Sequence, residues 1–252
     1  MALKNNLTKP RLDLLGAAFH DIQPRFALPP ELDQEALIVD DHSPSQLSTL
    51  MERLEEISVE FVPITEAIAL MSMVAATVNS NSNQSGFWES DVNAVRIIGP
   101  ASHHSLSISR LPNGSNLQYE SPVAIIVELT RLACLALLAA LKLRFSLPAT
   151  EVAQLCERFC KLLQHDISRY SEDTLELVLW ATVTVALVGS DEQRQSTMHS
   201  TGALMSQMGL LSGVETISRA KQIIWIDHLH SEGATNLAQE IDNYIHPENI
   251  LT

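Results

Sequence analysis

The chain has 252 residues, of which 46% are hydrophobic and 18% are charged, so it can bury a sizeable core and is not globally disordered. Its formal net charge of −14 repels the phosphate backbone of nucleic acids, which argues against direct binding to DNA or RNA. With only 9 Gly and 11 Pro, the composition favours helices over an architecture with many β-turns.

The cysteine count and the N-terminal sequence indicate the compartment. There are three cysteines, an odd and low number that is typical of a reducing environment. The first residues, MALKNNLTKPRLDLL, contain no apolar core of a secretory signal. We therefore expect an intracellular, cytoplasmic protein, with the nucleus left open as the other compartment.

The first third of the chain contains three stretches with helical spacing of apolar residues. One follows Thr8 and runs to about His20. The second follows a capping box formed by Ser43 and Gln46, and the third begins near Pro63 and runs towards Val78. The second is the clearest, with apolar residues at Leu47, Leu50, Met51, Leu54 and Ile57.

The segment 79–118 has no readable periodicity. It opens on the polar run NSNSNQS and contains the pair His103-His104 and a Pro112-Asn113-Gly114 turn. Because a loop this long in a compact domain is usually disordered or functional, the sequence predicts a mobile loop or cover segment here. His103 and His104 are then either polar surface or groups that reach a ligand from the cover.

The most apolar stretch is SPVAIIVELTRLACLALLAALKLRF, from Ser121 to Phe145. Ser121 and Pro122 form a helix start, and every residue from 132 to 141 is apolar, which indicates a helix enclosed by protein on all sides. Glu128 and Arg131 interrupt the apolar run, so we do not expect a membrane span. The two form either an i,i+3 ion pair or the wall of a buried cavity.

Further helices are predicted after this central one. Ser171 and the boxes Ser190/Gln193 and Ser212/Glu215 supply helix starts, and Gly209 supplies a helix end. The sequence thus predicts one all-α domain over residues 1–252, with about eight or nine helices around a buried central helix. The later helices are expected from Pro148 to about Leu163, over 174–188, over 190–209, over 212–230 and over 234–245.

No sequence signature of a hydrolase nucleophile, a phosphate-binding loop, a zinc protease or a dinucleotide fold is present. Cys156 and Cys160 have the i,i+4 spacing of a helical metal pair, but no further ligand lies near them in the sequence, so core thiols are the better interpretation. The sequence therefore predicts neither a metal nor a cofactor.

The last third of the chain resembles a known family. It contains Leu175-Glu176-Leu177-Val178-Leu179-Trp180, then Met208-Gly209-Leu210 closing a polar helix, then Ile223-Ile224-Trp225-Ile226-Asp227. This order, together with the apolar helix that contains Arg131, resembles the regulatory, ligand-sensing domain of fungal-specific zinc-cluster transcription factors over about residues 120–245. The resemblance implies an all-helical fold, a homodimer and, as in the sterol-sensing members, an apolar ligand between helices. The six-cysteine DNA-binding cluster of that family is missing from this sequence.

Two functions follow as expectations. The first is a stand-alone binding protein for an apolar fungal metabolite, such as a terpenoid, sterol or polyketide. The alternative is a cofactor-independent cyclase of fungal secondary metabolism that catalyses a pericyclic step of the hetero-Diels–Alder type. Such a step needs a held substrate and one or two hydrogen bonds rather than a nucleophile or metal. A purely structural dimerisation module is the third possibility.

The residues expected at the site combine charged groups on the central helix with adaptable apolar wall. Arg131 is the first choice for holding a carbonyl or enolate oxygen while it pairs with Glu128. His104 completes the polar set, and the ligand-binding wall is expected from His103, Trp180, Met205, Met208 and Trp225.

Overall fold

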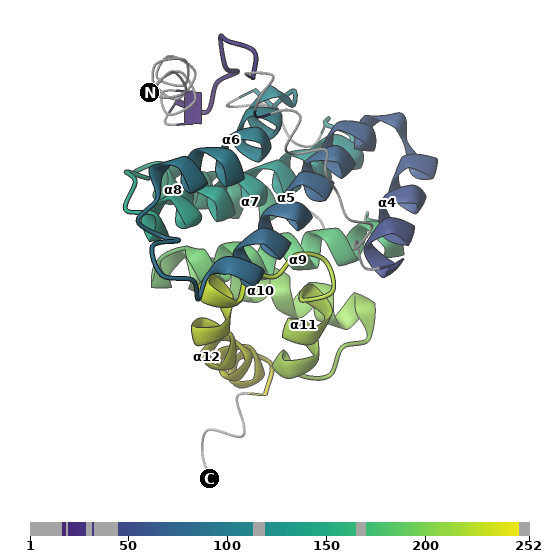
Figure 1. The fold of residues 1–252 in the computed structure, drawn as a ribbon. Coiled ribbons are helices and arrows are strands. Elements are labelled where there is room, and N and C mark those ends of the chain that lie inside the picture. The colour runs from purple at the N-terminus through teal and green to yellow at the C-terminus, as the bar shows by residue number, and fades with distance from the viewer. Residues whose placement is uncertain are drawn as a thin grey trace.

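The computed structural model describes residues 17–18, 20–28, 32, 45–112, 119–164 and 170–246. Within these ranges it contains nine α-helices, one short 3-10 helix and no strand, which confirms the predicted all-α domain (Figure 1). The helices are α4 (Ser45–Ile57), α5 (Val62–Asn81), α6 (Asp91–Ser107), α7 (Pro122–Arg144), α8 (Val152–Leu163), α9 (Glu172–Val188), α10 (Asp191–Met208), α11 (Gly213–Ala220) and α12 (Asp227–Ile245), with the 3-10 helix Val59–Phe61 before α5.

Helix α7 is the central element, as predicted. The side chain of Ser121 accepts a hydrogen bond from the backbone N–H of Ala124, and Pro122 occupies the first turn, so the helix begins where the sequence places its start. It contacts α5, α6, α8 and α9, and every residue from Ile125 to Ala139 is buried. Burial on all sides explains why its sequence shows no polar face.

Two packing clusters share helix α9. The larger cluster lies around α7 and includes Trp180, while Val183 and Ala186 on the other side of α9 belong to a smaller cluster formed with α10, α11 and α12. The Thr182–Val185 stretch, whose alternation is ambiguous between strand and helix, is helical in the structure. Helix α9 therefore joins the C-terminal helices to the core around α7 (Figure 1).

The predicted start and stop signals are confirmed for α7 and α10. Ser171 occupies the N-cap position of α9 without a side-chain cap hydrogen bond, and α8 begins at Val152 rather than at Pro148. Ser190 and Gln193 form the complete capping box of α10, and Gly209 ends that helix with a left-handed φ of 67°. The predicted Ser212/Glu215 box is only half formed. Ser212 accepts from the N–H of Glu215, but the Glu215 carboxylate accepts from Leu211. Ser43 and most of the predicted first helix lie outside the described residues.

The segment 79–118 is not one long loop, and that prediction is corrected. Helix α6 occupies 91–107, begins at the N-cap Ser90 and continues through Pro100. Gly99 and Pro100 hide the helical pattern because both have low helix propensity. Eight residues of α6, among them this pair, are buried in the domain, where α6 packs against α5 and α7, and this packing outweighs the weak local preference.

The prediction of one continuous helix over 212–230 is also wrong, because the middle of this range is not helical. Helix α11 ends at Ala220, residues 221–226 are irregular, and α12 begins at Asp227. Side chains from distant helices satisfy the backbone at this break. Trp180 donates to the carbonyl of Ile224, and Asn79 donates to the carbonyl of Trp225 and accepts from the N–H of Asp227. These long-range bonds replace the helical ones.

Two helical segments are long and apolar enough to span a membrane by length and composition, Val59–Asn81 and Pro122–Arg144. In the second, 89% of the most apolar window is buried inside the protein, and in the first 50% is buried. The core helix of a folded domain passes the same test of length and hydropathy, so this observation is weak evidence for a membrane location.

Candidate functional site

The predicted pair Glu128–Arg131 forms the centre of a buried ion cluster. Nε and Nη2 of Arg131 donate to the two carboxylate oxygens of Glu128 at 2.8 and 2.9 Å. Nη1 and Nη2 donate to the two oxygens of Asp21 at 2.7 and 2.9 Å. Arg131 and Glu128 are each 1% exposed. The guanidinium is thus held by two carboxylates at once, an arrangement with strong geometric specificity.

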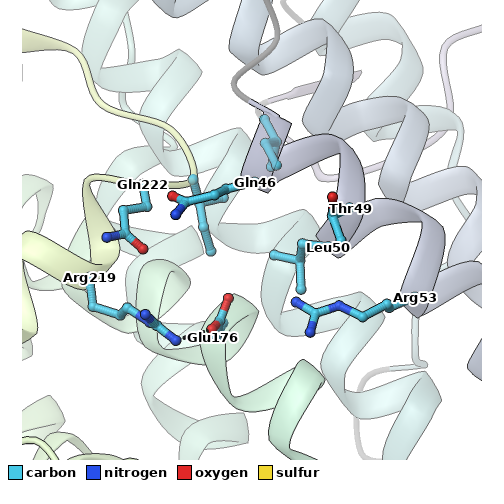
Figure 2. Close-up of a pocket in the computed structure, with 9 residues that line it drawn as sticks. Gln46, Thr49, Leu50, Arg53, Glu176, Arg219 and Gln222 are labelled. Atoms are coloured by element: carbon cyan, nitrogen blue, oxygen red, sulfur yellow. Dashed lines mark hydrogen bonds and ion pairs between the residues drawn. The ribbon is translucent and has the colours of Figure 1, made fainter.

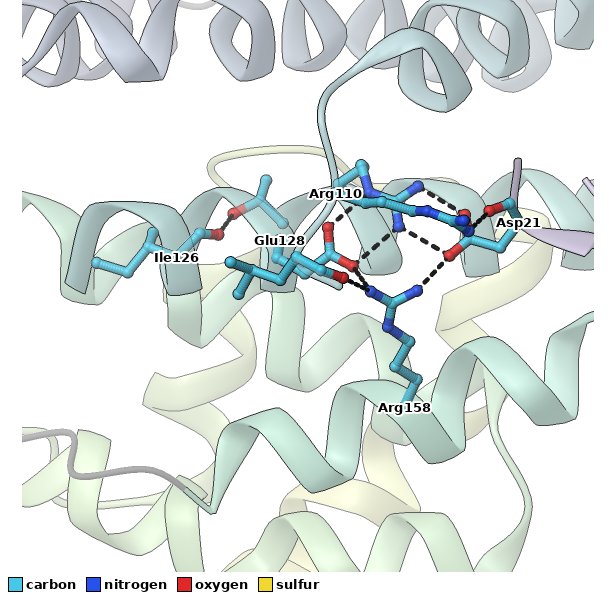
Figure 3. A network of polar contacts seen from close by, with 8 residues as sticks. Asp21, Arg110, Ile126, Glu128 and Arg158 are labelled. Carbon is cyan, nitrogen blue, oxygen red and sulfur yellow. Dashed lines mark hydrogen bonds and ion pairs between the residues drawn. The ribbon is translucent and has the colours of Figure 1, made fainter. Parts of the chain in front are cut away.

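Arg110 and Arg158 complete what we call the arginine cluster: Asp21, Arg110, Glu128, Arg131 and Arg158. Figure 3 shows Asp21, Arg110, Glu128 and Arg158 in this cluster. Arg158 on α8 lies 2.6 Å from an Asp21 carboxylate oxygen and 2.7 Å from a Glu128 oxygen. Arg110, in the segment after α6, donates to the backbone carbonyl of Asp21. Arg131 and Arg158 thus bind both carboxylates, and Arg110 binds the backbone of Asp21. Together these bonds join Asp21 to α7, to α8 and to the segment after α6.

The cluster shifts the pKa values of its members. Burial alone raises the pKa of Asp21, but hydrogen bonds from Arg131 and the charges of Arg131, Arg158 and Arg110 outweigh it, so the pKa lies below its ordinary 3.8. Burial alone lowers the pKa of Arg131, but bonds to Glu128 and Asp21 raise it above its ordinary value. Asp21 and Arg131 are therefore both charged at neutral pH.

Asp21, Arg110 and Arg158 were not among the residues expected from the sequence. Asp21 is 110 residues from Arg131 and 137 residues from Arg158 in the sequence, so no local spacing links it to either partner. The one signal in the sequence that could have pointed to a buried charge is at Arg158, which is next to the buried Phe159 on the amphipathic α8.

The aromatic residues expected at the site lie in or beside the core. Trp180 is fully buried and donates to the carbonyl of Ile224 at 2.9 Å. Trp225 is half-buried, and the centroid of its ring lies 4.5 Å from that of His230. Nζ of Lys221 lies over the Trp225 ring, 4.7 Å from the ring centroid. Neither the indole N–H of Trp225 nor Nε2 of His230 has a hydrogen-bond partner among the described residues.

The two predicted methionines do not share one environment. Met205 is 2% exposed and belongs to the smaller packing cluster, whereas Met208 is half-buried and packs against the larger one. The histidine pair also diverges. Nε2 of His103 lies 3.0 Å from the carbonyl of Phe26, and Nε2 of His104 lies 2.9 Å from the carbonyl of Pro63. The structure thus brings together Glu128 and Arg131, while the other predicted site residues remain spread over the fold.

The three cysteines are buried and unpaired. Burial raises the pKa of Cys134 and of Cys156 to about 12 and that of Cys160 to about 11, which keeps the thiols protonated at neutral pH. In the described part of the chain, no group of three or more His, Cys, Asp or Glu side chains is arranged to hold a metal ion.

A cavity of about 640 Å³ lies between the start of α5, the end of α6 and the start of α7. We call it the α6–α7 cavity. Two residues in its wall connect it to the arginine cluster. Arg110, a member of the cluster, donates to the carbonyl of Asp21, and the carbonyl of Leu111 accepts from Arg158. Of the eight residues expected at the site, only His104 lines this cavity or either of two smaller cavities among the described residues. The α6–α7 cavity is lined by Glu60, Pro63, His104, Ser107, Ile108, Ser109, Arg110, Leu111, Glu120, Ser121, Ala124 and Val127.

Carbon forms much of the cavity wall, and the charged groups are of both signs. Arg110 is exposed and contributes a guanidinium group, whereas Glu60 and Glu120 add two carboxylates. Because a carbonyl can only accept, the contact with Pro63 makes Nε2 of His104 the donor and leaves Nδ1 of a neutral ring as an acceptor. The lining therefore suits a largely apolar, uncharged molecule with a few polar atoms better than an anion.

His230 leads to a prediction about pH. Burial, and secondarily the charge of Lys221, lower the pKa of His230 to about 4, and its Nδ1 accepts a hydrogen bond from the N–H of Ile226. The unfolded chain takes up this proton near pH 6.5 and the folded protein only near pH 4, so stability falls as the pH drops through this window. We expect His230 to contribute a loss on the order of 3 kcal/mol in the free energy of unfolding between pH 7 and pH 4.

Urea unfolding across this pH range measures the effect. His230→Asn is the matched variant, because its side-chain oxygen can accept from Ile226 without titrating. Its stability should change less steeply with pH than that of the unaltered protein. Equal slopes for the two proteins would show that His230 is not a buried neutral histidine.

Comparisons of this chain with protein-family models, with curated proteins and with solved structures find no match. The fold and the two features described above, the arginine cluster and the α6–α7 cavity, are therefore the basis for an assignment of function.

Proposed function

We propose that this protein binds an apolar small molecule, of the terpenoid, sterol or polyketide kind, in the α6–α7 cavity. The observation that carries the proposal is the cavity itself. Its volume of about 640 Å³ is within the range of small-molecule sites, roughly 300–1,000 Å³. Pro63, Ile108 and Val127 supply carbon for the body of the ligand, while His104 and Arg110 supply polar groups that fix its orientation.

The arginine cluster has a supporting role in this proposal. Arg131 is 1% exposed and its donors are engaged by Glu128 and Asp21, so contact with a ligand oxygen would require breaking those bonds. Arg110 is the member of the cluster that reaches the cavity. We therefore place the ligand-facing charge on Arg110, with Asp21 holding it in position.

We further propose that the chain is related to the regulatory domain of fungal zinc-cluster transcription factors. The all-helical fold and the buried helix that contains Arg131 support this relationship. The order of the tryptophan-bearing helix, the Gly209 helix end and the Ile223–Asp227 run remains its sequence basis. A homodimer, as in that family, is part of the same proposal.

Filling the cavity is expected to abolish binding. Ala124 lies on the cavity wall in the first turn of α7, and replacing it by Trp places an indole in the ligand's volume. A screen of sterols, terpenoids and polyketides by thermal shift should identify a ligand that stabilises the unaltered protein. For that ligand, Ala124→Trp should raise the dissociation constant at least about tenfold, equivalent to ~1.4 kcal/mol.

Ala76→Trp is the matched control, since Ala76 is an exposed helical alanine on α5 that does not line the α6–α7 cavity. It should bind the ligand as the unaltered protein does. The proposal fails if no apolar class stabilises the protein, or if Ala124→Trp and Ala76→Trp bind equally well.

A second function, the pericyclic cyclase, is favoured by one observation. Arg110 places a permanently charged hydrogen-bond donor on the wall of an otherwise uncharged stretch of lining formed by Ile108, Leu111 and Val127. Such a donor can polarise a bound dienophile or quinone methide. Neighbouring genes distinguish the two functions, because a biosynthetic cluster supports the enzyme and a gene for a partner regulator supports the binding protein.

A further inference from the structure

A second cavity, of about 340 Å³, lies between α4, α9 and the end of α11. It shares no lining residue with the α6–α7 cavity. Figure 2 shows Arg53 and Arg219 extending from opposite sides towards Glu176, with the amides of Gln46 and Gln222 above them.

Each guanidinium group at this cavity is held by an ion pair and is also partly exposed to solvent. Nη1 of Arg53 lies 3.0 Å from Oδ1 of Asp173, and Nη2 of Arg219 pairs with Oε1 of Glu176. The two arginine side chains are 45% and 44% exposed. A guanidinium has five N–H donors, so these ion pairs fix the direction of each group and leave further donors for a ligand.

The rest of the lining has a clear division of polarity. Leu47, Leu50 and Ile223 are buried and form an apolar floor. The amides of Gln46 and Gln222 are exposed and can donate as well as accept. The floor suits a short carbon skeleton, and the donors around it suit an acceptor-rich group.

The charges narrow the class of ligand. The whole chain has a net charge of −14, so an anion is not drawn to this surface by the overall field and must be recognised by local contacts. Arg53 is paired with Asp173 and Arg219 with Glu176, and the N–H groups that each guanidinium has left over can bind a ligand carboxylate bidentately. Glu176 repels a second negative charge but can accept from a hydroxyl or ammonium group.

We propose that this cavity is a second binding site, which takes a small carboxylic acid that also has a hydroxyl or ammonium group. The carboxylate binds between Arg53 and Arg219, and the hydroxyl or ammonium donates to Glu176. This site is independent of the function proposed for the α6–α7 cavity, and either can fail without the other.

Titration of the full chain with L-lactate, L-alanine and inorganic phosphate, followed by NMR, tests the proposal. The expected result is saturable shifts of the backbone amides of Gln222 and Ile223 with one of the two carboxylic acids, and weaker binding of phosphate. Arg219→Gln together with Arg53→Gln should weaken the binding of that acid at least about tenfold, because both bidentate partners are lost.

Lys161→Gln is the matched control, since it removes one positive charge from an exposed ion pair on α8, away from the cavity. It should bind the acid as the unaltered protein does. The proposal is overturned if neither acid shifts these amides, if the double arginine variant binds normally, or if phosphate binds as tightly as the acids.

Discussion

Replacing Arg131 by Met is expected to lower the free energy of unfolding by about 3–5 kcal/mol. Methionine keeps much of the packing of the side-chain stem, but the guanidinium that bridges Glu128 and Asp21 is lost. Of the ion pairs described above, only those with Arg158 then still hold the two carboxylates, and Glu128 is 1% exposed, so water cannot compensate. Urea denaturation followed by far-UV circular dichroism measures the loss.

Two variants sharpen this test. Glu128→Gln in the same chain as Arg131→Met removes the charge that was left unpaired, and it should recover part of the loss. Arg219→Met breaks an ion pair whose arginine is 44% exposed, so it should cost less than about 1 kcal/mol. If Arg131→Met is no more costly than Arg219→Met, the arginine cluster does not stabilise the fold.

The same variants test the role first expected of Arg131. A double variant Arg131→Met with Glu128→Gln that folds and binds the ligand of the α6–α7 cavity normally would make the role of Arg131 structural. Loss of binding in that folded variant would place a ligand contact at Arg131, contrary to the assignment to Arg110.

Replacing Trp180 by Ala is expected to cost about 3–5 kcal/mol of stability. The indole is fully buried in the larger packing cluster, so truncation leaves a cavity beside α7. It also removes the N–H that satisfies the carbonyl of Ile224 in the break between α11 and α12. Thermal or urea unfolding of the variant provides the measurement.

Trp180→Phe separates volume from hydrogen bonding. Phenylalanine keeps most of the packing but cannot donate to Ile224, so the expected loss is about 1–3 kcal/mol, the cost of an unsatisfied buried acceptor. A loss for Phe as large as that for Ala would show that the hydrogen bond dominates. No loss for either variant would contradict the buried position of Trp180.

The sequence predicts those parts of the fold that depend on neighbouring residues. The cap at Ser121, the capping box at Ser190 and the helix end at Gly209 are correct because each is formed by groups within four residues of one another. The buried central helix is correct because a continuous apolar run leaves no face for water.

The errors arise where distant contacts outweigh local preference. Helix α6 continues through Gly99 and Pro100 because much of it, these two residues included, is buried in the domain, where it packs against α5 and α7. The break before α12 exists because Trp180 and Asn79, from α9 and α5, satisfy its backbone groups. Neither effect has a signal in the local sequence.

The candidate site also has one part that follows from local spacing and another part that depends on distant contacts. Glu128 and Arg131 are one helical turn apart, so their pairing could be predicted from spacing alone. Asp21, Arg110 and Arg158 join them only through the tertiary fold, and the α6–α7 cavity is formed by side chains of three separate segments.

The position of Asp21 also has a consequence for the order of events during synthesis. The ribosome makes Asp21 137 residues before Arg158, the partner on α8 to which it bonds. Until α8 emerges, the carboxylate near the N-terminus lacks part of its binding site, even when α7 is already helical. Closure of the arginine cluster is thus a long-range step that cannot precede the synthesis of α8.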